Sequence, residues 1–181
     1  MLVLIGPSAS GKTEVVKILI NKYGMNKLIT YTTRTMRPGE KNGVDYHFVT
    51  FSHFRAMAEA EEFIETTYYN NNYYGSKKKD VVLNKVVVLD PNGLNHLYRV
   101  LGEAIVTVFL ETPEKIRIER MRKRGDSEDD IERRIKNDNI LFNKANILKI
   151  DRVVKNETID LEQLAADIYH FYRQKTSFLI L

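Results

Sequence analysis

The chain has 181 residues, of which 43% are hydrophobic and 29% charged, and its formal net charge is +4. This length and composition favour one globular domain with a single core and exclude an intrinsically disordered chain. The sequence holds no cysteine, which excludes disulfide bonds, a thiol nucleophile and a cysteine-ligated zinc site.

Strand-like and helical segments alternate along most of the chain. Apolar runs typical of strands cover residues 2–5, 27–31, 86–89, 104–110 and 151–155. Helical periodicity covers residues 12–22, 91–101, 113–124, 128–142 and 160–175. The alternation predicts an α/β fold in which helices cover both faces of a parallel sheet. The runs at 86–89 and 104–110 are apolar nearly throughout, which predicts central strands.

The first strand is followed by Gly6-Pro7-Ser8-Ala9-Ser10-Gly11-Lys12-Thr13, which has the spacing of a P-loop. Glycines let the backbone curl tightly enough to aim several N–H groups at one phosphate, and the next helix adds its positive N-terminal end. We expect Lys12 on the outer phosphates of a nucleoside triphosphate and the Thr13 hydroxyl on a bridging Mg²⁺ ion. A glycine-rich turn that binds nothing is the alternative, but the flanking strand and helix favour a P-loop NTPase-type fold.

A change of pattern between residues 33 and 85 predicts a small α+β lobe inserted in the larger body. Its expected elements are a turn at 35–40, a strand at 46–49, a helix at 51–60 with Ser52 as candidate N-cap, and strands at 63–69 and 73–75. Further along, Gly125-Asp126-Ser127 separates two arginine-rich helices and predicts a mobile lid. We expect one domain over 1–181, with the core at 1–32 and 77–181, the lobe at about 33–76 and the lid at about 124–135.

Four segments resemble the nucleotide-binding lobe of the guanylate kinase family: Thr30 to Glu40, Gly43 to Val49, Glu62 to Glu65 and Asn72 to Ser76. A weaker similarity in the order of elements runs to roughly residue 170. The resemblance implies magnesium- and ATP-dependent phosphoryl transfer to GMP or dGMP in a cytoplasmic enzyme. The expected partners are small molecules, without nucleic acid or membrane, and both monomer and homodimer stay open.

Arginines and tyrosines of the predicted lobe form the first candidate binding site. A pair of guanidinium groups with nearby tyrosine hydroxyls is a good receptor for a monophosphate dianion. Without the motif, such arginines are more often solvated surface charges and such tyrosines half-buried core residues. By resemblance, the residues that hold the GMP phosphate are Arg34, Arg37, Tyr46 and Tyr74.

The guanine base presents N1–H and N2–H₂ as adjacent donors, which one ionised carboxylate accepts together. Glu65 is the family's candidate for this role, and Asp90 resembles a second acidic partner of the amino group. Thr30 and Ser76 resemble the hydroxyl residues that meet O6 or N7. The alternatives are an exposed strand position for Glu65 and an N-cap before the next helix for Asp90.

Arginines around the predicted lid form the third group of candidate site residues. Phosphoryl transfer spreads negative charge over equatorial oxygens, and arginines on a closing lid stabilise that charge. The resemblance assigns Arg124 and Arg134 to the phosphates and places Arg120 beside the ATP base. Three neighbouring cations are more typical of solvated helix faces: Arg122, Lys123 and Arg133.

The sequence departs from the family at several positions. Val88 stands where an acid is usual, which removes an outer-shell contact to magnesium, and the lid after Gly125 aligns as one residue shorter. Lys77 to Lys79 are an unusually basic opening for a helix. Two other functions stay open at this point. One is a related P-loop kinase of another small phosphate, and the other is a non-catalytic module that binds phosphopeptides with the same lobe.

Overall fold

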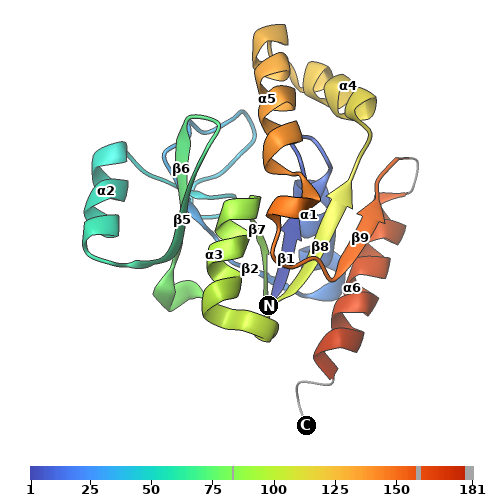
Figure 1. Ribbon diagram of the computed structural model, residues 1–181, viewed down its shortest axis with the longest axis horizontal. Helices are drawn as coiled ribbons and strands as arrows, with labels where there is room; N and C mark the ends of the chain where they lie inside the picture. Colours follow the sequence, from blue (N-terminus) through green and yellow to red (C-terminus); the bar gives the residue numbers. More distant parts are fainter. Residues whose placement is uncertain (83, 158–159, 178–181) are drawn as a thin grey trace.

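The computed structural model describes residues 1–82, 84–157 and 160–177. The sequence leaves open whether the apolar tail at 178–181 packs on the core or on a second subunit, and this tail lies outside the described residues. Figure 1 shows a central sheet with a lobe on its left and two helices rising above it. Among the described residues, no helix is long and apolar enough to cross a membrane.

The central sheet has five parallel strands. In spatial order they are β2 (Asn26–Lys27), β7 (Lys85–Val88), β1 (Leu2–Ile5), β8 (Val106–Glu111) and β9 (Arg152–Lys155). β7 and β8 flank β1, so the two most apolar runs are central strands as predicted. All four residues of β1 are buried, because both faces of the sheet are covered.

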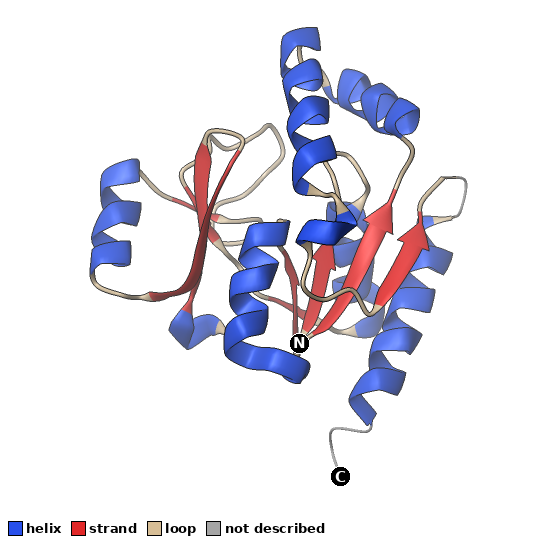
Figure 2. Ribbon diagram, viewed as in Figure 1, coloured by secondary structure: helices blue, strands red, loops and turns tan. Residues whose placement is uncertain are grey.

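Helices pack on both faces of this sheet (Figure 2). α1 (Lys12–Tyr23) and α6 (Leu161–Ser177) cover one face, where Val16 and Ile168 join the side chains of β1 and β8. α3 (Pro91–Leu101) covers the other face, where Leu94 and Leu97 contribute to a second core cluster. The prediction of a parallel sheet covered on both faces is therefore confirmed.

The lobe has its own four-stranded sheet. Its strands, in spatial order, are β4 (His47–Phe48), β3 (Tyr31–Thr32), β6 (Asn72–Lys77) and β5 (Phe63–Tyr69). α2 (Phe51–Glu59) packs on this sheet through Phe54 and Met57, which form a small core with Phe63. This core shares no residue with the two clusters of the central sheet.

Three sequence predictions about local structure are wrong. The run at 27–31 is divided, because Leu28 donates its N–H to Val86 of the central sheet whereas Tyr31 pairs with Gly75 of the lobe. The N-cap of α2 is Thr50 rather than Ser52, since the helix starts at Phe51 and the Thr50 hydroxyl accepts the N–H of His53. The basic segment after β6 opens only a single 3₁₀ turn, η1 (Lys78–Asp80).

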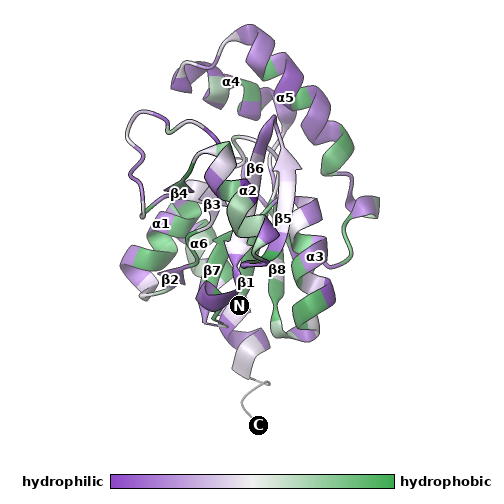
Figure 3. Cartoon of the chain, turned by 90° about the vertical axis from the view of Figure 1, so that its left-hand side faces the viewer, coloured by the Kyte–Doolittle hydropathy of each residue, from purple (hydrophilic) through white to green (hydrophobic). Residues whose placement is uncertain are grey.

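The predicted lid corresponds to two helices, α4 (Glu114–Arg124) and α5 (Glu128–Leu141). Gly125 ends α4 at a φ of 87°, and the Ser127 side chain caps α5 by accepting the N–H of Asp130. Figure 3 shows that both helices are predominantly hydrophilic, in contrast to the strands of the central sheet. Two short 3₁₀ turns complete the described elements: η2 (Gly102–Ala104) and η3 (Lys144–Asn146).

Candidate active site

A cleft opens where β1 and β7 end, between the central sheet, the second sheet and helices α4 and α5. It contains about 890 Å³ of space, part of it open to solvent. The predicted site residues that line it are Gly6, Ser8, Ala9, Lys12, Thr13, Thr30, Arg34, Arg37, Tyr46, Glu65, Tyr74, Asp90, Arg124 and Arg134. The predicted residues outside this lining are Pro7, Ser10, Gly11, Ser76 and Arg120. The structure thus brings most residues of the P-loop and of the three predicted groups of site residues to one cleft.

Two positions of the P-loop require glycine. Gly6 has a φ of 151°, and a Cβ there would lie 2.5 Å from the carbonyl oxygen of Leu110. Gly11 has a φ of 96°, and a Cβ there would lie 2.4 Å from Nδ2 of Asn156. At Gly6 the near atom belongs to the backbone and cannot easily move aside, and at Gly11 the left-handed φ itself disfavours a side chain, so the loop reaches its shape because both side chains are absent.

Lys12 is held inside the loop. Its ammonium group donates to the carbonyl oxygens of Gly6 at 2.6 Å and Pro7 at 2.8 Å, and to the hydroxyl of Ser10 at 3.2 Å. Burial lowers the pKa of Lys12 to about 8, against the opposing effect of nearby Asp138. The group is desolvated and held mostly by neutral oxygens, which a phosphate can replace with a stronger, charge-assisted partner.

The two lobe arginines lie in a loop organised by Glu40. The Glu40 carboxylate accepts two hydrogen bonds from Arg34, at 2.7 and 2.9 Å, and one from the Arg37 backbone N–H at 2.8 Å. Burial lowers the pKa of Arg37, and repulsion from the cations around the cleft lowers it further as a smaller effect. Burial also raises the pKa of Tyr46 to about 12, so its hydroxyl stays a donor. The site is therefore crowded with positive charge and suited to an anion.

Glu65 is 4% exposed, which excludes the exposed strand position considered above. Its Oε1 accepts the hydroxyl of Ser76 at 2.5 Å, whereas its Oε2 is buried without a hydrogen-bond partner. Burial raises the pKa of Glu65 to about 7. A Cβ at position 93 would lie 3.1 Å from Oε2, so Gly93 leaves room beside this oxygen. An unpaired acceptor on the wall of the cleft is suited to a ligand donor.

Asp90 serves as the N-cap of α3, which was the alternative for this residue. Its Oδ1 accepts the N–H groups of Asn92 at 2.8 Å and Gly93 at 3.2 Å, and also the hydroxyl of Thr67 at 3.2 Å. Asp90 still lines the cleft, with Thr30 and Thr67. The cap fixes the carboxylate at the end of β7, and it does not prevent a second contact from the same side chain.

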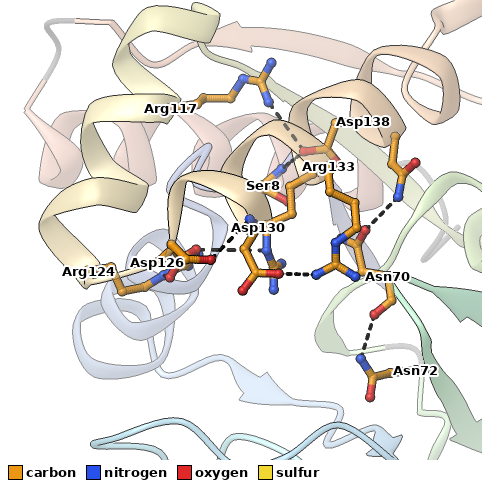
Figure 4. A network of polar contacts seen from close by, with 12 residues as sticks. Ser8, Asn70, Asn72, Arg117, Arg124, Asp126, Asp130, Arg133 and Asp138 are labelled. Atoms are coloured by element: carbon orange, nitrogen blue, oxygen red, sulfur yellow. Dashed lines mark hydrogen bonds and ion pairs between the residues drawn. The ribbon is translucent and has the colours of Figure 1, made fainter.

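The lid arginines that face the cleft are both close to Asp126. Arg124 forms an ion pair with the Asp126 carboxylate, and Nε of Arg134 lies 3.9 Å from it. Arg120 lies elsewhere, since it donates to the carbonyl oxygen of Ala9 at 3.2 Å and to Asn156 at 3.4 Å. Figure 4 shows the pairing of Arg133 with Asp130 on α5. This exposed pair fits the solvated face that was expected there.

The sequence and the fold agree with known proteins. A family model described as guanylate kinase matches residues 1–171. The chain belongs to the guanylate kinase family. A guanylate kinase from Wolbachia sp. subsp. Brugia malayi is 32% identical over 169 residues, which cover 88% of this chain and 86% of the relative. A guanylate kinase from Desulfotalea psychrophila is 36% identical over 146 residues, with 76% and 72% of the two chains covered.

A solved structure gives the same result for the fold of this guanylate kinase. The crystal structure of guanylate kinase from Anaplasma phagocytophilum superposes with a TM-score of 0.71 and 28% sequence identity. The match covers 97% of this chain and 85% of the other. The similarity therefore includes the central sheet and extends over the lobe and the lid.

Several residues of this guanylate kinase that lie at or beside the cleft were not predicted. Thr67, Tyr69 and Phe142 line it, and Asn156 adjoins the P-loop by donating to the carbonyl oxygen of Ser10 at 2.9 Å. Asp138 is 1% exposed and accepts the N–H of Ser8. A signal for Asp138 existed, because it follows Arg134 by four residues and so lies on the same face of α5.

Proposed function

We propose that this enzyme phosphorylates GMP and dGMP with ATP, giving ADP together with GDP or dGDP. The observation that carries the proposal is the placement of an intact P-loop and a buried, half-unpaired Glu65 in one cleft. The P-loop suits a nucleoside triphosphate, and the free carboxylate oxygen suits a base with adjacent donors. A kinase of another small phosphate and a non-catalytic module are not favoured, because guanylate kinase relatives match most of the chain.

The donor nucleotide occupies the P-loop in this proposal. Backbone N–H groups within residues 9–13 hold the phosphates, and Lys12 exchanges its carbonyl partners for phosphate oxygens. Arg120 and Asn156 lie together beside Gly11, and we place the adenine side of ATP there. Arg120 does not line the cleft, which agrees with a position at the adenine end of ATP, away from the transferred phosphate.

Mg²⁺ is a proposed cofactor, and the residues present fit an ion that takes most of its ligands from phosphates and waters. The described residues contain no group of three or more His, Cys, Asp or Glu side chains that could hold a metal ion by themselves. Mg²⁺ commonly takes one or two protein ligands and completes its shell with phosphates and waters. Thr13 lines the cleft and is the proposed ligand, whereas Val88 offers no acid. The ion would neutralise charge on the outer phosphates.

The acceptor lies in the lobe. Arg34 and Arg37 bind the GMP phosphate as charge-assisted donors, and the hydroxyls of Tyr46 and Tyr74 add neutral donors. Glu65 accepts N1–H and N2–H₂ of guanine while Ser76 holds its Oε1 in place. Thr30 and Asp90 complete the base site. Adenine offers a lone pair at N1 and a C–H at C2, so its binding leaves the buried carboxylate unpaired.

Phosphoryl transfer then needs positioning and charge stabilisation rather than a protein nucleophile. An acceptor phosphate oxygen attacks the γ-phosphorus in line, and the bond to the β–γ bridging oxygen breaks as ADP leaves. Lys12, Arg34, Arg124 and Arg134 surround the charge that develops on the equatorial oxygens. Product analysis by ³¹P NMR tests this function, with equal ADP and GDP expected with Mg²⁺ and neither in excess chelator. ADP without GDP would indicate hydrolysis instead of transfer.

The pKa of Glu65 predicts a pH dependence of GMP binding. Because burial raises this pKa to about 7, the carboxyl group takes up a proton as the pH falls through 7. Only the ionised form accepts both guanine donors, so the dissociation constant should rise about tenfold per pH unit below the pKa. Titration calorimetry measures it. The Glu65→Gln variant is the control, because its GMP binding changes with pH only through other groups, such as the phosphate of GMP. Identical plots of the dissociation constant against pH for both proteins would contradict the prediction.

The contacts of the arginines predict a closing motion. Arg34 is paired with Glu40, Arg124 with Asp126, and Lys12 with carbonyl oxygens, so each cation is held within its own part of the protein. GMP and a non-hydrolysable ATP analogue together should draw the lobe at 33–76 and the lid at 124–135 towards the core and exclude water. Small-angle scattering should show a smaller radius of gyration than with either ligand alone. An unchanged radius in the ternary complex would refute closure.

The division into core, lobe and lid remains part of this proposal, as does a cytoplasmic location. The lobe has a separate sheet and core cluster, which supports its movement as a unit.

A further inference from the structure

One buried carboxylate connects the lid, the P-loop and the lobe. Oδ2 of Asp138 accepts the Ser8 N–H at 2.7 Å and lies 3.4 Å from Nη1 of Arg117. Oδ1 accepts the hydroxyl of Tyr69 at 2.5 Å, and this hydroxyl lies 3.0 Å from the Ser8 Oγ. Figure 4 shows Ser8 and Arg117 meeting at Asp138. The four residues come from the P-loop, β5, α4 and α5, so several parts of the site meet at one side chain.

This carboxylate anchors a helix that has few other buried residues. Ile131 and Asp138 are the buried residues of α5. A helix that packs on a core ordinarily does so through an apolar stripe, which tolerates some sliding. Hydrogen bonds from Ser8 and Tyr69 are directional and define both the rotation and the height of α5 against the P-loop. Arg117 is 4% exposed and supplies the counter-charge that a buried carboxylate requires.

Arg134 lies one turn before Asp138 on the same face of α5. Its side chain lines the cleft and is 17% exposed, and its Nε is buried without a hydrogen-bond partner. The distance of 3.9 Å to Asp126 is too long for a hydrogen bond. The direction of Arg134 is therefore set mainly by the position of the helix that carries it.

We propose that Asp138 and Tyr69 are positioning residues for phosphoryl transfer, which hold α5 against the P-loop and the end of β5, also while the rest of the lobe moves, so that Arg134 faces the transferred group. This inference rests on the proposed function. Arg117 neutralises Asp138, so the pair adds little repulsion towards the phosphates. This positioning acts on the chemical step because Arg134 is assigned to the transition state, whereas GMP is held by the lobe.

Tyr69→Phe is the first test, because it removes one hydroxyl and leaves the Arg117–Asp138 pair intact. We expect kcat for GMP phosphorylation to fall about tenfold, as for a small misplacement of a catalytic group. KM for GMP should stay within about twofold, since the acceptor site is unchanged. The matched control is Tyr68→Phe on the same strand, whose side chain is 57% exposed and should leave both constants unchanged. A loss confined to KM would overturn the proposal.

A double-mutant cycle separates positioning from general support of the fold. If Tyr69 acts through Arg134, adding Tyr69→Phe to Arg134→Ala should lower kcat less than about twofold further. Asp138→Asn in the same background should behave alike, with Asp129→Asn as its exposed control on α5. Independent, multiplicative losses would overturn the positioning role while leaving the function intact. A wild-type protein that does not phosphorylate GMP would instead overturn the proposed function itself.

Discussion

Lys12→Met is expected to abolish phosphoryl transfer while the protein stays folded. The ammonium group is proposed to move from three P-loop oxygens to the outer phosphates, where it stabilises charge in the transition state. Loss of one such preorganised charge predicts a fall in kcat on the order of 10³. Methionine has a similar length and no charge. Rapid-quench measurement of GDP formation gives the rate of the chemical step.

The fold should tolerate this substitution for an electrostatic reason. Burial lowers the pKa of Lys12 to about 8, so the folded state disfavours the charged form and opposes its own stability below that pH. Removal of the charge should therefore leave the melting temperature equal or higher. GMP binding should persist, because the lobe does not include Lys12. Lys17→Met is the matched control on α1, where the side chain is 57% exposed. Near-normal turnover by Lys12→Met would contradict the assignment of the P-loop.

Glu65→Gln is expected to remove most of the selectivity for guanine. The amide has one acceptor oxygen and brings an NH₂ donor, so it cannot accept both N1–H and N2–H₂. In the proposed complex Oε2, which has no partner here, takes one guanine donor, and Oε1 takes the other while it still accepts the Ser76 hydroxyl. The ratio of kcat/KM for GMP to that for AMP should fall on the order of 10³. Steady-state assays with both nucleotides measure this ratio.

The control for this variant is Glu61→Gln, an exposed glutamate just before β5. It removes the same charge from a lobe residue that does not line the cleft, so the ratio of kcat/KM for GMP to that for AMP should stay unchanged. A Glu65→Gln enzyme with wild-type preference for GMP would remove Glu65 from the base site. It would also remove the physical basis of the predicted pH dependence.

Much of the fold follows from local patterns in the sequence. The apolar runs before Asp90 and Glu111 lie in central strands, because both faces of a parallel sheet are covered. The division of residues 27–31 between two sheets was not predictable in this way. The partners of Leu28 and Tyr31 are Val86 and Gly75, and local periodicity does not report such remote pairings. Likewise, two hydroxyl residues, Thr50 and Ser52, compete as caps of one helix, and only the helix start decides between them.

The site was predictable where spacing carries the chemistry. Gly6, Gly11 and Lys12 have a fixed separation in sequence, and the structure places them in one loop. Its spacing from Arg134 places Asp138 on the same face of α5, but its contacts had no such signal, because the partners Ser8 and Tyr69 are 130 and 69 residues away. A carboxylate within a charged helix ordinarily indicates a solvated face. Its burial arises from the packing of α5 against the P-loop.

Selectivity among acceptors tests the central claim most directly. A coupled assay of ADP release, with ATP and Mg²⁺ fixed, compares GMP, dGMP, AMP, CMP and UMP as substrates of the wild-type protein. The buried carboxylate of Glu65 predicts that GMP and dGMP are used far better than the other three, by a factor on the order of 10⁴ over AMP. Equal turnover of AMP and GMP, or ADP release that does not depend on the acceptor, would contradict a guanine-specific kinase.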